Sequence, residues 1–125
     1  MRTISIKLRN INHLHDLNSI VLALYQRTEF ENDDGIYCLN LRDLLKKLAD
    51  KIYSYSNRVS KKITLSIEIN QFNALKKLFL VSDAFLVEND LIHFRMILID
   101  IMDQGRVCFE LKYFFEITNS KNLNT

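Results

Sequence analysis

The chain has 125 residues, of which 48% are hydrophobic and 26% are charged, and its formal net charge is +2. This length suits one domain with a core of its own, and this composition excludes a largely disordered chain. The net charge is too small to indicate any class of partner by itself.

Three further features of the sequence limit the possible functions. Gly35 and Gly105 are the only glycines, which excludes the glycine-rich loops that hold phosphates. No apolar run is long enough for a membrane span, and residues 1–3 lead directly into an alternating segment instead of the apolar centre of a signal peptide. Cys38 and Cys108 lie far apart without metal-type spacing, so we expect two reduced cysteines in a cytoplasmic protein that does not contact membranes.

The first half of the chain predicts a strand followed by two helices. Apolar and polar residues alternate over 4–8, as they do in a strand with one buried face. A helical period then predicts a helix over 11–28 and a second helix over 40–56. Asn40 is expected as the N-cap residue of the second helix.

The second half repeats this order and adds a strand. Alternation predicts a strand over 63–69, and helical periods predict one helix that begins near Asn70 and another over 90–104. Gly105 is expected to stop the last helix as a left-handed C′ residue. Alternation resumes over 106–117, which predicts a closing strand.

Because the two halves can be laid over each other, with Ile6 on Leu65, we expect an internal duplication. Its pseudo-repeats are about 3–56 and 62–105. The predicted fold is α+β in the order β-α-α-β-α-α-β, a three-stranded, mostly antiparallel sheet with four helices packed on one face.

The expected domain organisation is simple. We predict a single α+β domain over 1–118, with 119–125 as a flexible tail. Fourteen Ile, twelve Asn and ten Lys residues indicate a low-GC genome, such as that of a bacterium or its phage.

Histidines and carboxylates form no convincing catalytic or metal-binding set. The segment 13–16 contains a His-Asp dipeptide, but a metal site would need His93 and the Asp100 and Asp103 pair as further ligands. These three residues share the polar side of one predicted helix, where a general acid–base pair is the alternative to a solvent-facing stripe. We expect no catalytic residue, no metal, no cofactor and no enzymatic activity.

Positive charge is concentrated between residues 42 and 77, where nine basic and three acidic residues give +6, so the rest of the chain carries −4. A basic strip with nearby aromatic residues is what binding to a nucleic-acid backbone requires. The alternatives are a solvated surface or a surface that faces an acidic protein. The candidate partner-binding residues are Arg42, Lys46, Lys47, Lys51, Tyr53, Tyr55, Arg58, Lys61 and Lys62.

Two residues break the pattern of their elements. Arg95 falls within the apolar arc of the last predicted helix, and Phe114 falls on the polar side of the closing strand. A charge in an apolar arc must reach water, find a carboxylate such as Glu68 or Glu110, or lie at an interface. Cover by a second chain explains both residues, so we predict a homodimer with Arg95 and Phe114 at its interface.

The leading hypothesis is a small non-enzymatic protein that binds another macromolecule, with a protein as its partner. Small size and a low-GC composition also suit a phage or mobile-element inhibitor, or an immunity-type protein. The alternative is a nucleic-acid-binding regulator that uses the basic 42–62 segment.

Overall fold

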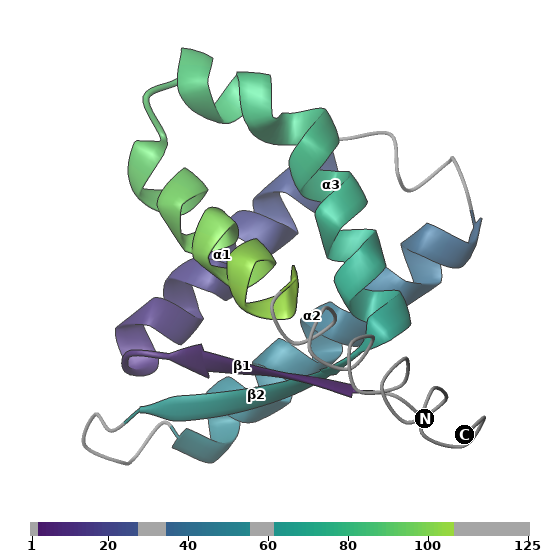
Figure 1. Ribbon diagram of the computed structural model, residues 1–125, viewed down its shortest axis with the longest axis vertical. Coiled ribbons are helices and arrows are strands. Elements are labelled where there is room, and N and C mark those ends of the chain that lie inside the picture. Colours follow the sequence, from purple (N-terminus) through teal and green to yellow (C-terminus); the bar gives the residue numbers. More distant parts are fainter. Residues whose placement is uncertain (1–2, 28–34, 56–61, 107–125) are drawn as a thin grey trace, which may run out of the picture.

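The computed structural model describes residues 3–27, 35–55 and 62–106. Figure 1 shows β1 (Thr3–Leu8) and β2 (Ile63–Glu68) side by side, with α1 (Ile11–Arg27), α3 (Ile69–Glu88) and a helix over 92–106 on the same side of them. None of the described helices is long and apolar enough to cross a membrane. The elements are β1 (Thr3–Leu8), α1 (Ile11–Arg27), α2 (Gly35–Tyr55), β2 (Ile63–Glu68), α3 (Ile69–Glu88) and the helix over 92–106.

The strands form because every second residue in them is a large aliphatic one. Ile4, Ile6 and Leu8 are at most 3% exposed, while the polar residues between them are exposed. The three aliphatic residues of β2 are buried in the same way. The predictions of these two strands and of a single packed sheet face are confirmed.

The two strands pair antiparallel, as predicted. Ile6 lies opposite Leu65, Ile4 opposite Ile67, and Leu8 opposite Ile63. The overlay of the two halves in the sequence also matches Ile6 with Leu65. A local, approximate two-fold axis that passes through this pair therefore relates the two strands. A common origin of the two halves stays a prediction.

The helix over 92–106 covers the outer edge of β1 at Lys7 with one side chain. The Lys7 backbone N–H donates to Gln104 Oε1 at 2.7 Å, and Gln104 Nε2 donates to the Lys7 carbonyl at 3.0 Å. Gln104 Nε2 also lies 3.0 Å from Asp100 Oδ2, to which it donates. Both backbone groups of Lys7 therefore point away from β2.

The helices bury one aliphatic stripe each. Leu14, Leu17 and Leu24 of α1 and Leu41 and Leu44 of α2 are all at most 2% exposed. Fully burying one such side chain contributes about 1.5–3 kcal/mol. α2 packs on α1 and α3, and one continuous core joins all four helices to the inner face of the sheet.

α3 has defined signals at both ends. Glu68 and Gln71 form a reciprocal capping box at its start. At its end the N–H of Asp90 donates to Val87 O at 3.3 Å and the N–H of Leu91 donates to the carbonyl five residues earlier at 2.9 Å. Asp90 has a φ of 57°, so an aspartate takes the left-handed position that glycine usually holds in this Schellman motif.

The predicted three-stranded sheet, with the order β-α-α-β-α-α-β, is wrong. The described residues form a two-stranded antiparallel sheet and four helices. Arg106, where the sequence predicts the closing strand to begin, is still helical, and 107–117 lies outside the described residues. Gly105 does not end the helix, since its φ is not positive. It packs against the ring of Phe72, where a Cβ would collide with the ring.

The start of α2 also differs from the prediction. The helix begins at Gly35, so Asn40 lies inside it and is not its N-cap. Cys38 is 6% exposed and packs in the core together with Leu41. Because Cys38 and Leu41 are buried on the same helical face, the helix extends toward its N-terminus beyond Asn40. Their packing in the core outweighs the preference of Asn40 for an N-cap position.

Candidate functional site

α2 carries most of the candidate partner-binding residues. They do not form one strip, because residues nine apart on a helix turn by about 180° and Arg42 and Lys51 therefore lie on opposite sides. Lys62 is exposed directly before β2, while Arg58 and Lys61 lie outside the described residues. The candidates on α2 are Arg42, Lys46, Lys47, Lys51, Tyr53 and Tyr55.

Arg42 ties α2 to α1. Its Nε donates to the Tyr25 hydroxyl at 2.8 Å, and this hydroxyl lies 3.1 Å from Cys38 Sγ. Tyr25 and Cys38 are each 6% exposed. The hydrogen bond with Cys38 and burial raise the pKa of Tyr25, while Arg42 opposes them. The phenol therefore stays neutral, and Arg42 has a structural role that the sequence does not reveal.

Two lysines on the other side of α2 also contact the protein itself. Lys47 Nζ donates to Gln71 Oε1 at 3.1 Å, the same oxygen that accepts from the Glu68 backbone N–H at 3.0 Å. Lys51 Nζ lies 5.5 Å from the centre of the Tyr55 ring. Lys47 thus joins α2 to the start of α3, which leaves Lys46 as the basic residue of α2 that points outward.

The outer face of α2 combines charge with exposed apolar side chains. Ile36 is 71% exposed, Leu39 is 60% exposed and Tyr53 is 84% exposed. Leu39 and Tyr53 lie about four helical turns apart and therefore share this face. We define the outer face of α2 as Ile36, Leu39, Asp43, Lys46, Asp50 and Tyr53, all of which are exposed.

Arg95 finds its counter-charge within the chain. Its Nε donates to Asp83 Oδ1 at 2.6 Å, between the helix over 92–106 and α3. Asp83 raises the pKa of Arg95 through this hydrogen bond and through its charge. The carboxylate is neither Glu68 nor Glu110, and the pair explains the charged residue without a second chain. Phe114 lies outside the described residues.

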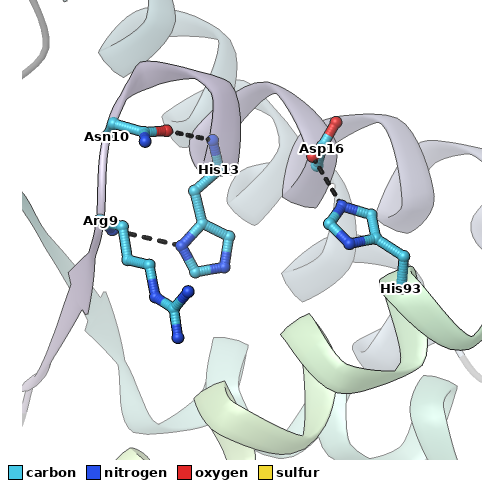
Figure 2. A network of polar contacts seen from close by, with 5 residues as sticks. All are labelled: Arg9, Asn10, His13, Asp16 and His93. Carbon is cyan, nitrogen blue, oxygen red and sulfur yellow. Dashed lines mark hydrogen bonds and ion pairs between the residues drawn. The ribbon is translucent and has the colours of Figure 1, made fainter.

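A polar hollow of about 580 Å³ lies between α1 and the helix over 92–106. It brings together side chains that are scattered in the sequence. In Figure 2 His13 lies beside Arg9 and Asn10 at the start of α1, while His93 reaches from the other helix to Asp16. The polar residues that line the hollow are Arg9, Asn10, Asn12, His13, Asp16, His93, Asp100 and Asp103.

The hydrogen bonds of His13 select one tautomer of its neutral ring. Its backbone N–H donates to Asn10 Oδ1 at 3.0 Å, and its Nδ1 accepts from the Arg9 backbone N–H at 3.2 Å. An Nδ1 that accepts carries no proton, so the neutral ring is protonated on Nε2. Burial lowers the pKa of His13, with Arg9 and His93 acting in the same direction and Asp100 and Asp16 against them.

His93 and Asp16 form the second contact of the hollow. His93 Nε2 donates to Asp16 Oδ2 at 3.0 Å. The side chains are 70% and 39% exposed, so solvent screens the pair and limits its contribution to at most about 1 kcal/mol.

The polar side chains that line the hollow are imidazoles, carboxylates, amides and one guanidinium. No group of three or more metal-ligating side chains occurs in the described part of the chain. The described residues that line the hollow include no serine, threonine, cysteine or lysine, so the side chains that could act as nucleophiles there are carboxylates and imidazoles. The arrangement is a polar surface with one oriented His-carboxylate pair.

The sequence reveals the members of this hollow without revealing that they meet. His93 and Asp16 are 77 residues apart, and only the packing of the helix over 92–106 on α1 joins them. The nearest sequence signal is the hypothetical ligand set of residues 13–16 with His93, Asp100 and Asp103, whose members His13, Asp16, His93, Asp100 and Asp103 line this one hollow.

Comparison with protein families, with curated proteins and with solved structures finds no match to this chain.

Proposed function

We propose that the protein acts without catalysis, by binding another protein through the outer face of α2. The observation that supports this most is the exposure of Ile36, Leu39 and Tyr53 on one face of a helix that is otherwise charged there. A single exposed aliphatic residue is ordinary. Anchors spaced along one helical face are typical of a helix that enters an apolar groove of its partner.

The chemistry of the partner follows from this face. Ile36 and Leu39 lie one turn apart and form one apolar anchor, while the exposed ring of Tyr53 offers a second, aromatic anchor. Asp43, Lys46 and other charges lie between the anchors. We expect a partner with an apolar groove whose rim carries both signs of charge, and we place the interaction in the cytoplasm, where the buried, unpaired Cys38 stays reduced.

Binding to nucleic acid remains the alternative, with less support. A phosphate backbone needs basic side chains along one track. Arg42 bonds Tyr25, Lys47 bonds Gln71, and Lys46 is flanked by carboxylates on the outer face. The basic residues of α2 therefore offer few contacts that a strand could follow.

The test compares two exposed leucines. Leu39→Ser removes an anchor from the outer face of α2, whereas Leu22→Ser removes a leucine that is 40% exposed on α1. Proteins retained from a native lysate by the parent chain and by Leu22→Ser, but not by Leu39→Ser, are purified and titrated by calorimetry. We expect the dissociation constant to rise at least about tenfold for Leu39→Ser alone.

Three outcomes would contradict the proposal. One is an equal effect of the two substitutions, another is the absence of any protein retained by the parent, and the third is retention that nuclease treatment abolishes. The last outcome would favour the nucleic-acid alternative.

A further inference from the structure

The outer edge of β2 is open. Because Lys7 points its N–H and C=O at Gln104, the alternation of an antiparallel pair turns the backbone groups of Leu65 toward β1. The backbone groups of Thr64 and Ser66 therefore point away from β1. Within the described residues neither of them has a hydrogen-bonding partner.

The two edges of the sheet therefore differ at the position of Lys7. At the edge of β1, Gln104 satisfies the outward groups of Lys7 from the helix over 92–106. At the edge of β2, no described side chain bonds the outward groups of Thr64 and Ser66. A row of unpaired N–H and C=O groups on a strand is a template for another strand.

We infer that this edge pairs with the β2 strand of a second copy of the chain, antiparallel, so that the two sheets become one sheet of four strands. A two-fold axis at Leu65 sets Thr64 opposite Ser66 of the partner subunit. Their outward backbone groups then exchange hydrogen bonds on both sides of the axis. Such an interface uses the same surface twice, as dimers with two-fold symmetry do.

Pairing of opposite charges favours the register with the axis at Leu65. With the axis at Leu65, the exposed Lys62 lies opposite Glu68 of the partner subunit, and this pair occurs twice. An axis at Ser66 would set Lys62 opposite Asn70 of the partner subunit and lose both pairs. Opposite charges placed directly across a strand pair stabilise it, so the strand is complementary to itself in the register that pairs its full length.

Proline substitutions on the two edges test the inference. Ser66→Pro removes an N–H that no internal hydrogen bond uses, and proline is tolerated in an edge strand at such a position. Ser5 lies opposite Ser66 in the sheet and points its N–H to the other edge, so Ser5→Pro is the matched control. Sedimentation equilibrium of the full chain should show a dimer for the parent and for Ser5→Pro, and dimerisation weakened about tenfold or more for Ser66→Pro.

A second variant keeps the test decisive if a proline disturbs folding. Lys62→Glu changes an exposed residue outside the strand and places like charges across the axis, so it should also weaken dimerisation. Circular dichroism checks that each variant is folded. A parent that sediments as a monomer at every concentration contradicts the inference, and so does a dimer that Ser66→Pro and Lys62→Glu leave intact.

Discussion

The ring of Phe72 occupies the space that a Cβ of residue 105 would need. Phe72 belongs to the first turns of α3, and Gly105 lies near the end of the helix over 92–106. The absence of a side chain at Gly105 lets this helix approach α3 and brings Gln104, its neighbour in the sequence, to the edge of β1. This close approach is therefore part of what holds the sheet and the last described helix together.

Gly105→Ala should destabilise the protein. Alanine favours a helix over glycine by about 1 kcal/mol, but forcing a methyl group against Phe72 costs about 1–3 kcal/mol or more. We expect a net loss of stability in urea unfolding. Gly35→Ala is the control, because within the described chain no atom outside its own stretch of helix lies within 4 Å of its Cβ position, and it should leave stability unchanged or slightly higher. A Gly105→Ala variant as stable as the parent would contradict the packing described here.

Ser82→Ala should stabilise the protein. Ser82 is 0% exposed and its hydroxyl has no hydrogen-bonding partner among the described residues, which costs about 1–3 kcal/mol. Replacing the hydroxyl with hydrogen removes this cost and leaves only a small void. Ser19→Ala on the exposed side of α1 measures the gain in helix propensity alone. The midpoint of thermal unfolding should rise more for Ser82→Ala than for Ser19→Ala, and equal shifts would argue against an unsatisfied hydroxyl.

Stability should fall as the pH is lowered through the range just below about 6.5. Burial lowers the pKa of His13 below the ordinary histidine value of about 6.5, so in that range the unfolded chain binds a proton that the folded chain does not. The contribution of His13 to folding stability is fully present above the pKa that His13 has in the unfolded chain. It is lost as the pH falls toward and below the pKa that His13 has in the folded protein.

A single substitution can assign this pH dependence. His13→Asn places Oδ1 where Nδ1 accepts from the Arg9 N–H and cannot titrate, so it should flatten the dependence measured by urea unfolding between pH 5 and 7, the range around that value. His15→Asn, which changes an exposed histidine of the same helix, is the control. The same flattening in both variants would remove His13 as the cause.

The parent protein should form no salt-sensitive complex with nonspecific DNA or RNA at physiological salt. A backbone binder loses affinity steeply as salt rises, in proportion to its phosphate contacts. Gel shifts across a salt series measure this directly. If a complex does form, replacing Lys46, Lys47, Lys61 and Lys62 with Glu should abolish it, and that result would favour the nucleic-acid alternative over a protein partner.

The sequence predicts the elements that local periodicity determines. Alternation identifies β1 and β2 with the correct buried faces, and the helical period identifies α1 within one residue at its end. Local signals fail where a tertiary contact overrides them. Asn40 has the side chain of an N-cap, yet burial of Cys38 carries α2 further back. Gly105 has the freedom of a helix stop, yet its contact with Phe72 uses it as a helical residue.

The candidate sites also combine features that local periodicity predicts with features that depend on tertiary packing. Exposure along a helix can be read from its period, and Lys46 and Tyr53 are exposed. Contacts between helices cannot be read in this way. Arg42 with Tyr25 and Arg95 with Asp83 depend on how the helices pack, so a sequence argument treats each of these residues as free for a partner.

The pairing of Ile6 with Leu65 also shapes how the chain must fold. Some sixty residues separate the two positions, and they include α1 and α2. The strands can meet only after that long loop closes, which costs entropy before any contact between them is made. β1 alone has no other described strand to pair with, so neither half can complete its inner face by itself. The first and second halves should therefore gain their structure together, in one cooperative step in which closing the sheet is a late and slow event.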